Sequence, residues 1–393
     1  MTTTARRTTT SARAAEARSG WLFVTPVLVI LGLFLVAPIL IALWVSVSDW
    51  AGKGSPLSGS VSFVGLDNYK ALLAQDSLAR SDFATAIRNN FYYVLLVVPI
   101  QTVLALGLAI LLNQQKLKGL SFFRTAYYFP SVTSSVAIGS VFLFLFAGAG
   151  SINAILGAIG VNGPNWFADP RGVGHLLLGL VGVGDGQNGP AALTDNGVFS
   201  LTWWDWLAGP SVAMCTIIGL VIWVSAGAYM LLFLAALQNI PGDVFEASAI
   251  DGAGTVRTYW SVVIPQLKPT LFTVLTLGLI GTWQVFDQIY IMSKGNPAKT
   301  TLTPAYLAYD ASINNGEWGA GTAMSFILFG IILVMTAIQW LVMRDRDTPL
   351  FRRRRRGGTD PGDDDGPLSN RALPTVTATA GVGRTSNTSG GLS

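Results

Sequence analysis

Long apolar runs separated by polar segments are the dominant pattern of this chain. Six runs are rich in Leu, Val, Ile and Phe, and each has the length of about 20 residues that a helix needs to cross a bilayer. They occupy residues 21–47, 91–112, 125–146, 212–236, 271–292 and 322–343. The pattern therefore predicts an all-α membrane protein with six transmembrane helices.

Composition agrees with a membrane location. Of the 393 residues, 51% are hydrophobic and only 12% are charged, about half the charged fraction of an average soluble domain. The apolar core of the first run is also far longer than the roughly 7 to 15 residues of a secretory signal. We therefore expect this run to remain in the protein as a helix.

The distribution of basic residues predicts the orientation. If the N-terminus is cytoplasmic, 18 of the 25 Lys and Arg residues fall in inner segments. The positive-inside rule then places both termini in the cytoplasm. Basic residues cluster after the last span, at Arg344, Arg346 and residues 352–356. Because they directly follow a span, we expect them to contact anionic lipid headgroups and not nucleic acid.

Composition also divides the chain into segments. Residues 1–20 and the tail after Gly357 have little to bury, so we expect them to be disordered. The expected order is a cytoplasmic N-terminus at 1–20, a first helix at 21–47, an external loop at 48–84, a core at 85–343 and a basic, then disordered, tail at 344–393. Within the core we expect an external insertion at about 148–210 and a cytoplasmic loop at 240–269.

Several kinds of chemistry are missing from the sequence. There is no G-x-x-x-x-G-K-[ST] phosphate loop, and the single Cys215 and single His175 leave no His/Cys cluster to bind zinc or iron. We find no catalytic group of acid, base and nucleophile, which argues against a membrane enzyme. Only Asp287 places a charge clearly inside a span. These absences favour a pore that receives its energy from elsewhere, and the alternative is a secondary carrier that works alone through Asp287.

The cytoplasmic segment 240–269 is the most informative part of the chain. Pro241 favours a helix start, and Gly252 breaks the helix after Ile250. A second helix is expected from Thr255 towards residue 264, with Pro265 ending it. The segment thus predicts two short helices joined by a tight bend, which together form a projecting knob.

The side chains of this segment suggest a docking surface. Glu246 and Asp251 offer negative charge to a basic partner. A face of small residues, which can seat closely in a groove, consists of Ala247, Ala249 and Ala253. Spacing alone does not distinguish this surface from an ordinary cytoplasmic loop.

The order of residues in the segment resembles the EAA loop of ABC importer permeases, whose sugar-transport members read approximately E-A-A-x-x-D-G-A-x5-F-x-x-I-x-L-P. The matching positions are Glu246, Ala247, Ser248, Asp251, Gly252, Ala253, Tyr259, Val262, Ile264 and Pro265. Four of them depart mildly from the family pattern, namely Ser248, Tyr259, Val262 and Ile264. The order and spacing are kept throughout.

The resemblance covers residues 82–344. Asn89 and Asn90, before the second span, are similar to the family's entry to that helix, where Thr is more common at the second position. Phe123, Arg124 and Pro130 match its F-R-x5-P pattern. The segment SKGNPAKTT, which begins at Ser293, stands where sugar permeases often carry T-x-G-G-P, and it departs at Ser293 and Asn296.

This resemblance implies a type I ABC importer permease in a bacterial inner membrane. Two related permeases would form the pore as a heterodimer, two ATPase subunits would bind ATP and Mg, and an extracytoplasmic binding protein would deliver the sugar. No cofactor is expected in this chain. The resemblance further implies that Glu246 pairs with a basic residue of an ATPase, that Asp251 supports the bend and that Gly252 supplies it.

Polar and aromatic residues in spans four and five are candidates for the path of a sugar. Span five carries Gln284, Asp287 and Ile291 at helical spacings of three and four, with Trp283 and Tyr290 on an adjoining face. Span four adds Trp223, Ser225 and Tyr229. An intramembrane carboxylate needs a partner or a wet cavity, so Asp287 is the strongest candidate. Trp223 and Tyr290 serve equally well as interface anchors.

The outer loop that follows the third span, residues 147–210, is unusually long for the resemblance. Residues 172–200 do not align with the family pattern, so we expect an insertion there. Its last part, LTWWDWL at residues 201–207, carries three tryptophans. We expect these to anchor the loop in the membrane interface, with contact to a binding protein as the alternative.

Overall fold

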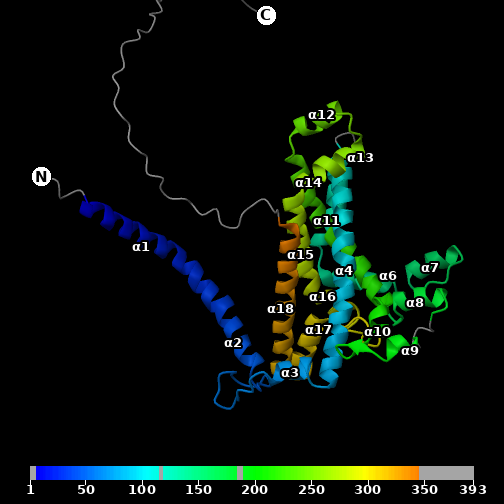
Figure 1. Ribbon diagram of the computed structural model, residues 1–393, viewed down its shortest axis with the longest axis horizontal. Coiled ribbons are helices and arrows are strands. Elements are labelled where there is room, and N and C mark those ends of the chain that lie inside the picture. The colour runs from blue at the N-terminus through cyan, green and yellow to red at the C-terminus, as the bar shows by residue number, and fades with distance from the viewer. Residues whose placement is uncertain (1–5, 115–117, 184–188, 345–393) are drawn as a thin grey trace, which may run out of the picture. The chain divides into compact units, whose positions relative to one another are not determined.

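The computed structural model describes residues 6–114, 118–183 and 189–344, and nearly all regular structure in them is helical (Figure 1). The longer helices are α1 (Arg6–Leu31), α4 (Leu78–Leu112), α11 (Val212–Gln238), α15 (Lys268–Trp283) and α18 (Trp318–Met343). The shorter ones are α2 (Ala37–Ser46), α3 (Asp67–Leu73), α5 (Leu120–Val132), α6 (Ser135–Leu145), α7 (Ser151–Ala158), α8 (Val173–Leu180), α9 (Ala191–Thr194), α10 (Trp203–Leu207), α12 (Gly242–Ile250), α13 (Thr255–Thr258), α14 (Ile264–Gln266), α16 (Asp287–Met292) and α17 (Pro304–Tyr309). Strands β1 (Gly197–Val198) and β2 (Leu201–Thr202) form one antiparallel pair.

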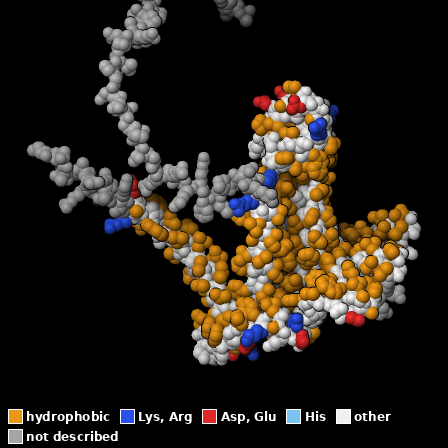
Figure 2. Space-filling view, in the orientation of Figure 1, with side chains coloured by type: hydrophobic (Ala, Val, Ile, Leu, Met, Phe, Trp, Pro, Cys, Tyr) orange, Lys and Arg blue, Asp and Glu red, His pale blue; other side chains and the backbone are white. Residues whose placement is uncertain are grey.

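The predicted all-α membrane fold is confirmed. Five helical segments of the described chain are long and apolar enough to cross a bilayer, and a bent pair makes a possible sixth. The five are Glu16–Ser46, Leu78–Leu112, Val212–Gln238, Lys268–Met292 and Trp318–Met343. Hydrophobic side chains cover most of the body between its two ends (Figure 2), as lipid contact requires.

The expected third span is not one straight helix. α5 and α6 meet at an angle of 97°. The break lies at Thr133, whose backbone is extended. The first hydrogen bond of the next helix runs from the amide of Ile138 to the carbonyl oxygen of Ser134. Hydroxyl-bearing residues on both sides of the break compete for backbone hydrogen bonds, which favours helix ends over continuous helix.

Two helices begin earlier than the sequence suggested. α1 begins at Arg6, so the prediction that residues 6–20 lack structure is wrong. Extending a helix that has already formed costs far less than starting one, and this segment is rich in Ala and Arg. α4 begins at Leu78, inside the loop expected at 48–84, where the Ser77 side chain accepts from the amide of Arg80. The expected basic segment and tail after Arg344 lie outside the described residues.

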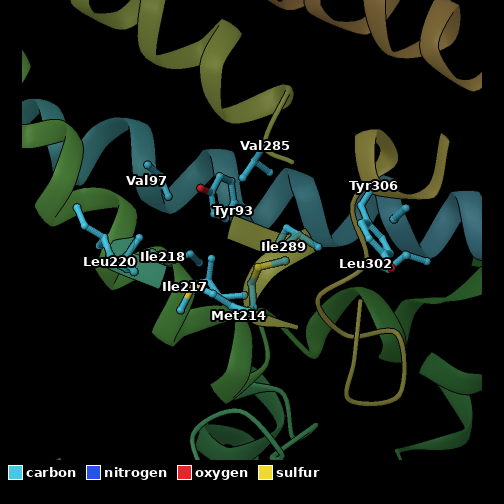
Figure 3. Packing of buried hydrophobic residues seen from close by; sticks show 13 residues of the cluster. Tyr93, Val97, Met214, Ile217, Ile218, Leu220, Val285, Ile289, Leu302 and Tyr306 are labelled. Carbon is cyan, nitrogen blue, oxygen red and sulfur yellow. The ribbon is translucent and has the colours of Figure 1, made fainter. Parts of the chain in front are cut away.

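The core lies where α4, α11 and α15 pack together. One buried cluster gathers side chains of α4, α11 and α16, including Tyr93, Met214 and Ile289 (Figure 3). A second cluster lies nearer α12 and includes Phe233 and Val263. The two clusters are separate, and each gives one part of the bundle its apolar core.

The backbones of α11 and α5 approach each other closely at Gly227. A Cβ atom placed on Gly227 would lie 2.0 Å from the carbonyl oxygen of Tyr127. No side chain fits at that distance, so α11 reaches α5 only because residue 227 is a glycine. Small residues commonly allow such contacts between membrane helices.

Replacing this glycine therefore separates the two helices. We expect Gly227→Ala to lower the free energy of unfolding of the detergent-solubilised protein by about 1–3 kcal/mol, the usual range for overpacking. Gly219→Ala is the matched control, because it lies on the same helix with no atom within 4 Å of the added Cβ. Thermal unfolding of both variants checks the prediction, and equal stability of the two would contradict it.

Candidate functional site: a projecting knob and a central polar pocket

The segment 240–269 forms a projecting knob at the end of the molecule where α12 lies (Figure 1). α12 ends at a tight bend, in which Gly252 has φ +71. The amide of Ala253 donates to the carbonyl oxygen of Ser248 at 3.0 Å, and the amide of Gly252 to that of Ala249 at 3.1 Å. This pair of hydrogen bonds is the Schellman arrangement, which needs a left-handed residue where Gly252 lies. The predicted helix, bend and helix are confirmed.

Side chains fix the two helices of the knob to each other and to the bundle. Ser248 is buried, and its hydroxyl lies 3.4 Å from that of Thr258 on α13. Phe245 and Tyr259 pack against the buried cluster that contains Phe233. The knob is therefore attached to the membrane helices through apolar contacts.

Pro265 does not end the second helix, as the sequence suggested. The chain widens into one π-helical turn at Tyr259–Val263 and continues through α14 as far as Gln266. Pro265 lies in the first turn of α14, where a missing amide hydrogen is tolerated. Its ring is exposed at the surface of the knob.

The outer surface of the knob carries both charged and apolar side chains. Of the residues singled out from the sequence, Glu246, Ala247, Asp251 and Gly252 are exposed, whereas Ala253 is half-buried. Figure 2 shows acidic and basic side chains gathered at this end. The sequence analysis missed three large apolar residues that are also exposed here, at 86%, 72% and 70%, namely Ile250, Val256 and Trp260. Exposed apolar groups next to charges are typical of a protein interface.

A polar pocket lies at the centre of the bundle, between α4, α11 and the α15–α16 segment. Its volume is about 330 Å³, within the range of small-molecule sites. Its lining includes hydroxyl, amide and carboxylate groups from all three elements, supplied by Tyr93, Gln101, Ser225, Tyr229, Thr282, Gln284, Asp287 and Gln288. Such a set of groups suits a solute with many hydroxyls.

The structure brings together only half of the residues that the sequence analysis proposed for the solute path. Tyr229, Gln284 and Asp287 line the pocket. Trp283 is instead 2% exposed and packs in a cluster with α4 and α18. Trp223 lies against Phe142 with ring centroids 5.8 Å apart, outside the pocket lining.

Tyr290 also lies outside the pocket lining, in a group of four aromatic rings. Its ring is 5.5 Å from that of Phe286 and 5.5 Å from that of Tyr309. Tyr306 completes the group at 6.4 Å from Tyr290. Because Phe286 borders the pocket, the group is adjacent to it.

The shared helical face expected in span five does not exist, because the helix is interrupted. α15 ends at Trp283, α16 begins at Asp287, and the residues between are not helical. Side chains from elsewhere pair with the carbonyl groups that this break exposes. The side chain of Asn90 donates to the carbonyl oxygen of Trp283 at 3.1 Å, and that of Thr303 to the carbonyl oxygen of Val285 at 3.2 Å.

Gln101 and Thr282 are pocket residues that the sequence analysis missed. Gln101 lies in the middle of α4, and its amide oxygen is 2.5 Å from the hydroxyl of Ser225 on α11. A signal was available, since Gln101 and Thr102 are the one polar pair within the apolar run 91–112. The sequence did not indicate which residues contact Gln101, because they lie on two other spans.

The segment expected to be an insertion, residues 148–210, folds onto the end of the bundle opposite the knob (Figure 1). Trp204 is buried and stacks on His175, with ring centroids 4.3 Å apart, so the expectation that all three tryptophans of this segment anchor in the interface is wrong. Asp205 caps α10 together with Thr202. Nearby, hydrogen bonds from the Arg171 side chain lower the pKa of Asp169. This packing and the cap of α10 hold the segment in a defined fold.

The segment after span five is held by buried polar groups. The Asn89 side chain donates to the carbonyl oxygens of Lys299 and Leu302, at 2.8 and 3.1 Å. Thr301 donates to the carbonyl oxygen of Asn296, and Lys299 pairs with Asp82 at 2.6 Å. These contacts give Asn89 a structural role that the sequence left unassigned.

Comparison with known proteins gives consistent matches. A model of the family described as binding-protein-dependent transport system inner membrane component matches residues 71–346. A probable ABC transporter permease protein of Pyrococcus horikoshii is 32% identical over 81% of this chain and 94% of its own length. The lactose transport system permease protein of Rhizobium radiobacter is 30% identical over 84% of this chain and 95% of its own length.

Solved structures agree with the fold. A chain from the crystal structure of a bacterial ABC transporter involved in the import of the acidic polysaccharide alginate is similar with a TM-score of 0.64 at 18% identity. The match covers 86% of this chain and the whole of the other. At that identity the similarity establishes the arrangement of the helices and not the solute.

The bend of the knob can be tested apart from any partner. Gly252→Ala has open space for its Cβ but a backbone at φ +71, so we expect a cost of about 1–2 kcal/mol. Hydrogen exchange at the amide of Ala253 should therefore rise about 5- to 30-fold. Gly254→Ala is the control, because its Cβ also meets no atom and its φ is −67. Unchanged exchange in Gly252→Ala would show that the bend does not stabilise the knob.

Proposed function

The chain belongs to the family of binding-protein-dependent transport system inner membrane components, and on that premise we propose that it is the permease subunit through which an ABC importer moves a neutral di- or oligosaccharide. The observation that carries the proposal is the knob. It is a rigid two-helix projection, fixed to α11 and α15 by Phe245 and Tyr259, with its polar and apolar surface exposed.

We propose that the knob faces the cytoplasm, as do both termini. The distribution of basic residues supports this orientation, because 18 of the 25 fall on the knob side of the membrane under the expected topology. The opposite end, with α3, α10 and the insertion, then faces outwards. A binding protein arriving from outside would meet that end.

The energy for transport would come from two separate ATPase subunits, which bind ATP and Mg and dock on the knobs. Glu246 offers negative charge to a basic side chain of the ATPase, and Ile250, Val256 and Trp260 offer apolar area around it. Closure of the ATPases on ATP would then displace α12. Because the knob packs on the membrane helices, this displacement becomes a rigid-body switch of the pore.

A second, related permease would complete the pore. Supporting this, the apolar stretch of the Glu16–Ser46 span is not buried by the rest of the chain, and much of α18 is also exposed. Lipid covers part of this area, and the second permease covers another part. Half of the solute path then belongs to each permease.

The lining of the central pocket supports a neutral sugar as the solute. Amide and hydroxyl groups dominate it, and Asp287 supplies the one carboxylate among its lining residues. Relatives carry names such as lactose, arabinooligosaccharide and trehalose/maltose transport system permease. A sugar of two or more rings agrees with both observations.

A stand-alone secondary carrier that uses Asp287 is the second candidate. It is favoured by the position of this exposed carboxylate beside the pocket. It gives no function to the knob, however, and it does not account for membership of a binding-protein-dependent family. The importer accounts for both.

If ATPase subunits dock on the knob, reversing the charge of Glu246 weakens their binding. In Glu246→Lys we expect at least a tenfold loss of ATPase subunits that co-purify with the detergent-solubilised protein, because like charges at an interface cost several kcal/mol. Asp195→Lys makes the same charge change on an exposed residue of the insertion and serves as the control.

The outcomes separate the two candidate functions. Loss of ATPase from Glu246→Lys alone supports docking on the knob. Equal recovery of ATPase with both variants would assign docking to another surface. If the unmodified protein brings down no ATPase, the importer is rejected and transport through Asp287 becomes the leading hypothesis.

A further inference from the structure

The side chain of Gln101 stands at the point where α4, α11 and α15 meet. It follows Val97, which Figure 3 labels, by one helical turn, and it is 1% exposed. Its Oε1 lies 2.5 Å from the hydroxyl of Ser225, while its buried Nε2 has no hydrogen-bond partner. In proteins, burying an amide group without a hydrogen-bond partner lowers the free energy of unfolding by about 1–3 kcal/mol.

The neighbouring hydroxyl cannot satisfy this amide fully. Ser225 lies 2.6 Å from the carbonyl oxygen of Val221 and 2.5 Å from Gln101, but it has only one proton to donate. A half-turn of the amide lets Ser225 donate to Val221 and accept from Gln101 Nε2. One amide atom of Gln101 still remains without a partner in either orientation.

Space around the amide is provided by a glycine. A Cβ atom on Gly278 of α15 would lie 2.6 Å from Gln101 Nε2. The amide therefore occupies the gap that Gly278 leaves, and both residues border the central pocket. A structure that only needed to pack α4 against α15 would fill this gap with an apolar side chain.

We propose that Gln101 is a specificity-determining residue, whose free amide atom forms a hydrogen bond with one hydroxyl of the sugar in the pocket. The inference rests on the proposed function and assigns a recognition role to α4, outside the spans that the sequence analysis had nominated. A sugar hydroxyl both donates and accepts, so it pairs with the amide in either of its orientations.

The consequence is selectivity against sugars that lack this hydroxyl. A site built to pair with a hydroxyl rejects an analogue without it, because the buried amide then stays unpaired. The free energy of one such hydrogen bond corresponds to uptake of the parent sugar that is about five- to tenfold faster than uptake of the analogue without the hydroxyl. An amide that only holds α4 to α11 produces no preference among sugars.

The test uses the complete importer in proteoliposomes, comprising this chain, the second permease, the ATPases and the binding protein. Lactose, maltose, trehalose and arabinotriose are offered to the unmodified importer, and the sugar it accumulates fastest becomes the parent. Uptake rates of the parent and of its monodeoxy analogues are then measured for the unmodified importer and for Gln101→Met. Because the same binding protein delivers every sugar, its own selectivity cancels in the comparison.

Thr102→Val is the matched control. Thr102 is the neighbouring buried polar residue on α4, but its hydroxyl bonds to the carbonyl oxygen of Val98 and it does not border the pocket. Gln101→Asn is the second variant, because it keeps an amide but withdraws it from the pocket by one methylene. If Gln101→Met fails to assemble into the importer, the preference among sugars is measured in Gln101→Asn instead.

We expect the unmodified importer and Thr102→Val to prefer the parent over at least one analogue by about five- to tenfold. In Gln101→Met this preference should fall below about twofold, with an intermediate value for Gln101→Asn, while ATP hydrolysis stimulated by the loaded binding protein persists. Unchanged preferences for every analogue in both Gln101 variants would overturn the proposal, even if total uptake falls. If the unmodified importer accumulates none of the four sugars, the proposed function fails, and this inference fails with it.

Discussion

A polypeptide in hydrocarbon must pair its own backbone N–H and C=O groups, and this constraint decides where the chain can depart from a helix. α4, α11 and α18 cross as unbroken helices. The break between α15 and α16 is possible because Asn90 and Thr303 pair with the carbonyl groups of Trp283 and Val285. The central pocket forms at this break, so the polar residues that support the backbone also position the groups that face a solute.

Two helices, α11 and α15, connect the pocket with the knob. α11 carries Ser225 and Tyr229 at the pocket and, further along, packs against Phe245 and Tyr259 of the knob. α15 does likewise with Gly278 and Val274. The knob and the pocket are thus joined by the same two helices. This arrangement fits a subunit that receives its energy from a partner.

The sequence predicted best what depends on local patterns. Apolar runs gave the spans, and Gly252 with its flanking residues gave the bend, because a left-handed residue at a helix end leaves a local signature. Features that rest on distant partners were missed. The residues of the break, 284–286, include no Gly or Pro, and its support comes from Asn90 on another helix. Gln101 was visible with Thr102 as a polar pair in an apolar run, but the Ser225 hydroxyl that contacts its amide lies 124 residues away. Trp204 looked like an interface anchor until its stacking on His175 was known.

The central claim is that this chain conducts sugar only when an ATPase drives it. The most direct measurement is uptake of radiolabelled lactose, maltose, trehalose or arabinotriose into proteoliposomes that hold both permeases and the external binding protein, with and without the ATPase subunits and ATP. We expect accumulation against a gradient only when ATPase and ATP are both present, and none with a proton gradient alone. Accumulation by this chain without the ATPase, driven by a proton gradient, would contradict it.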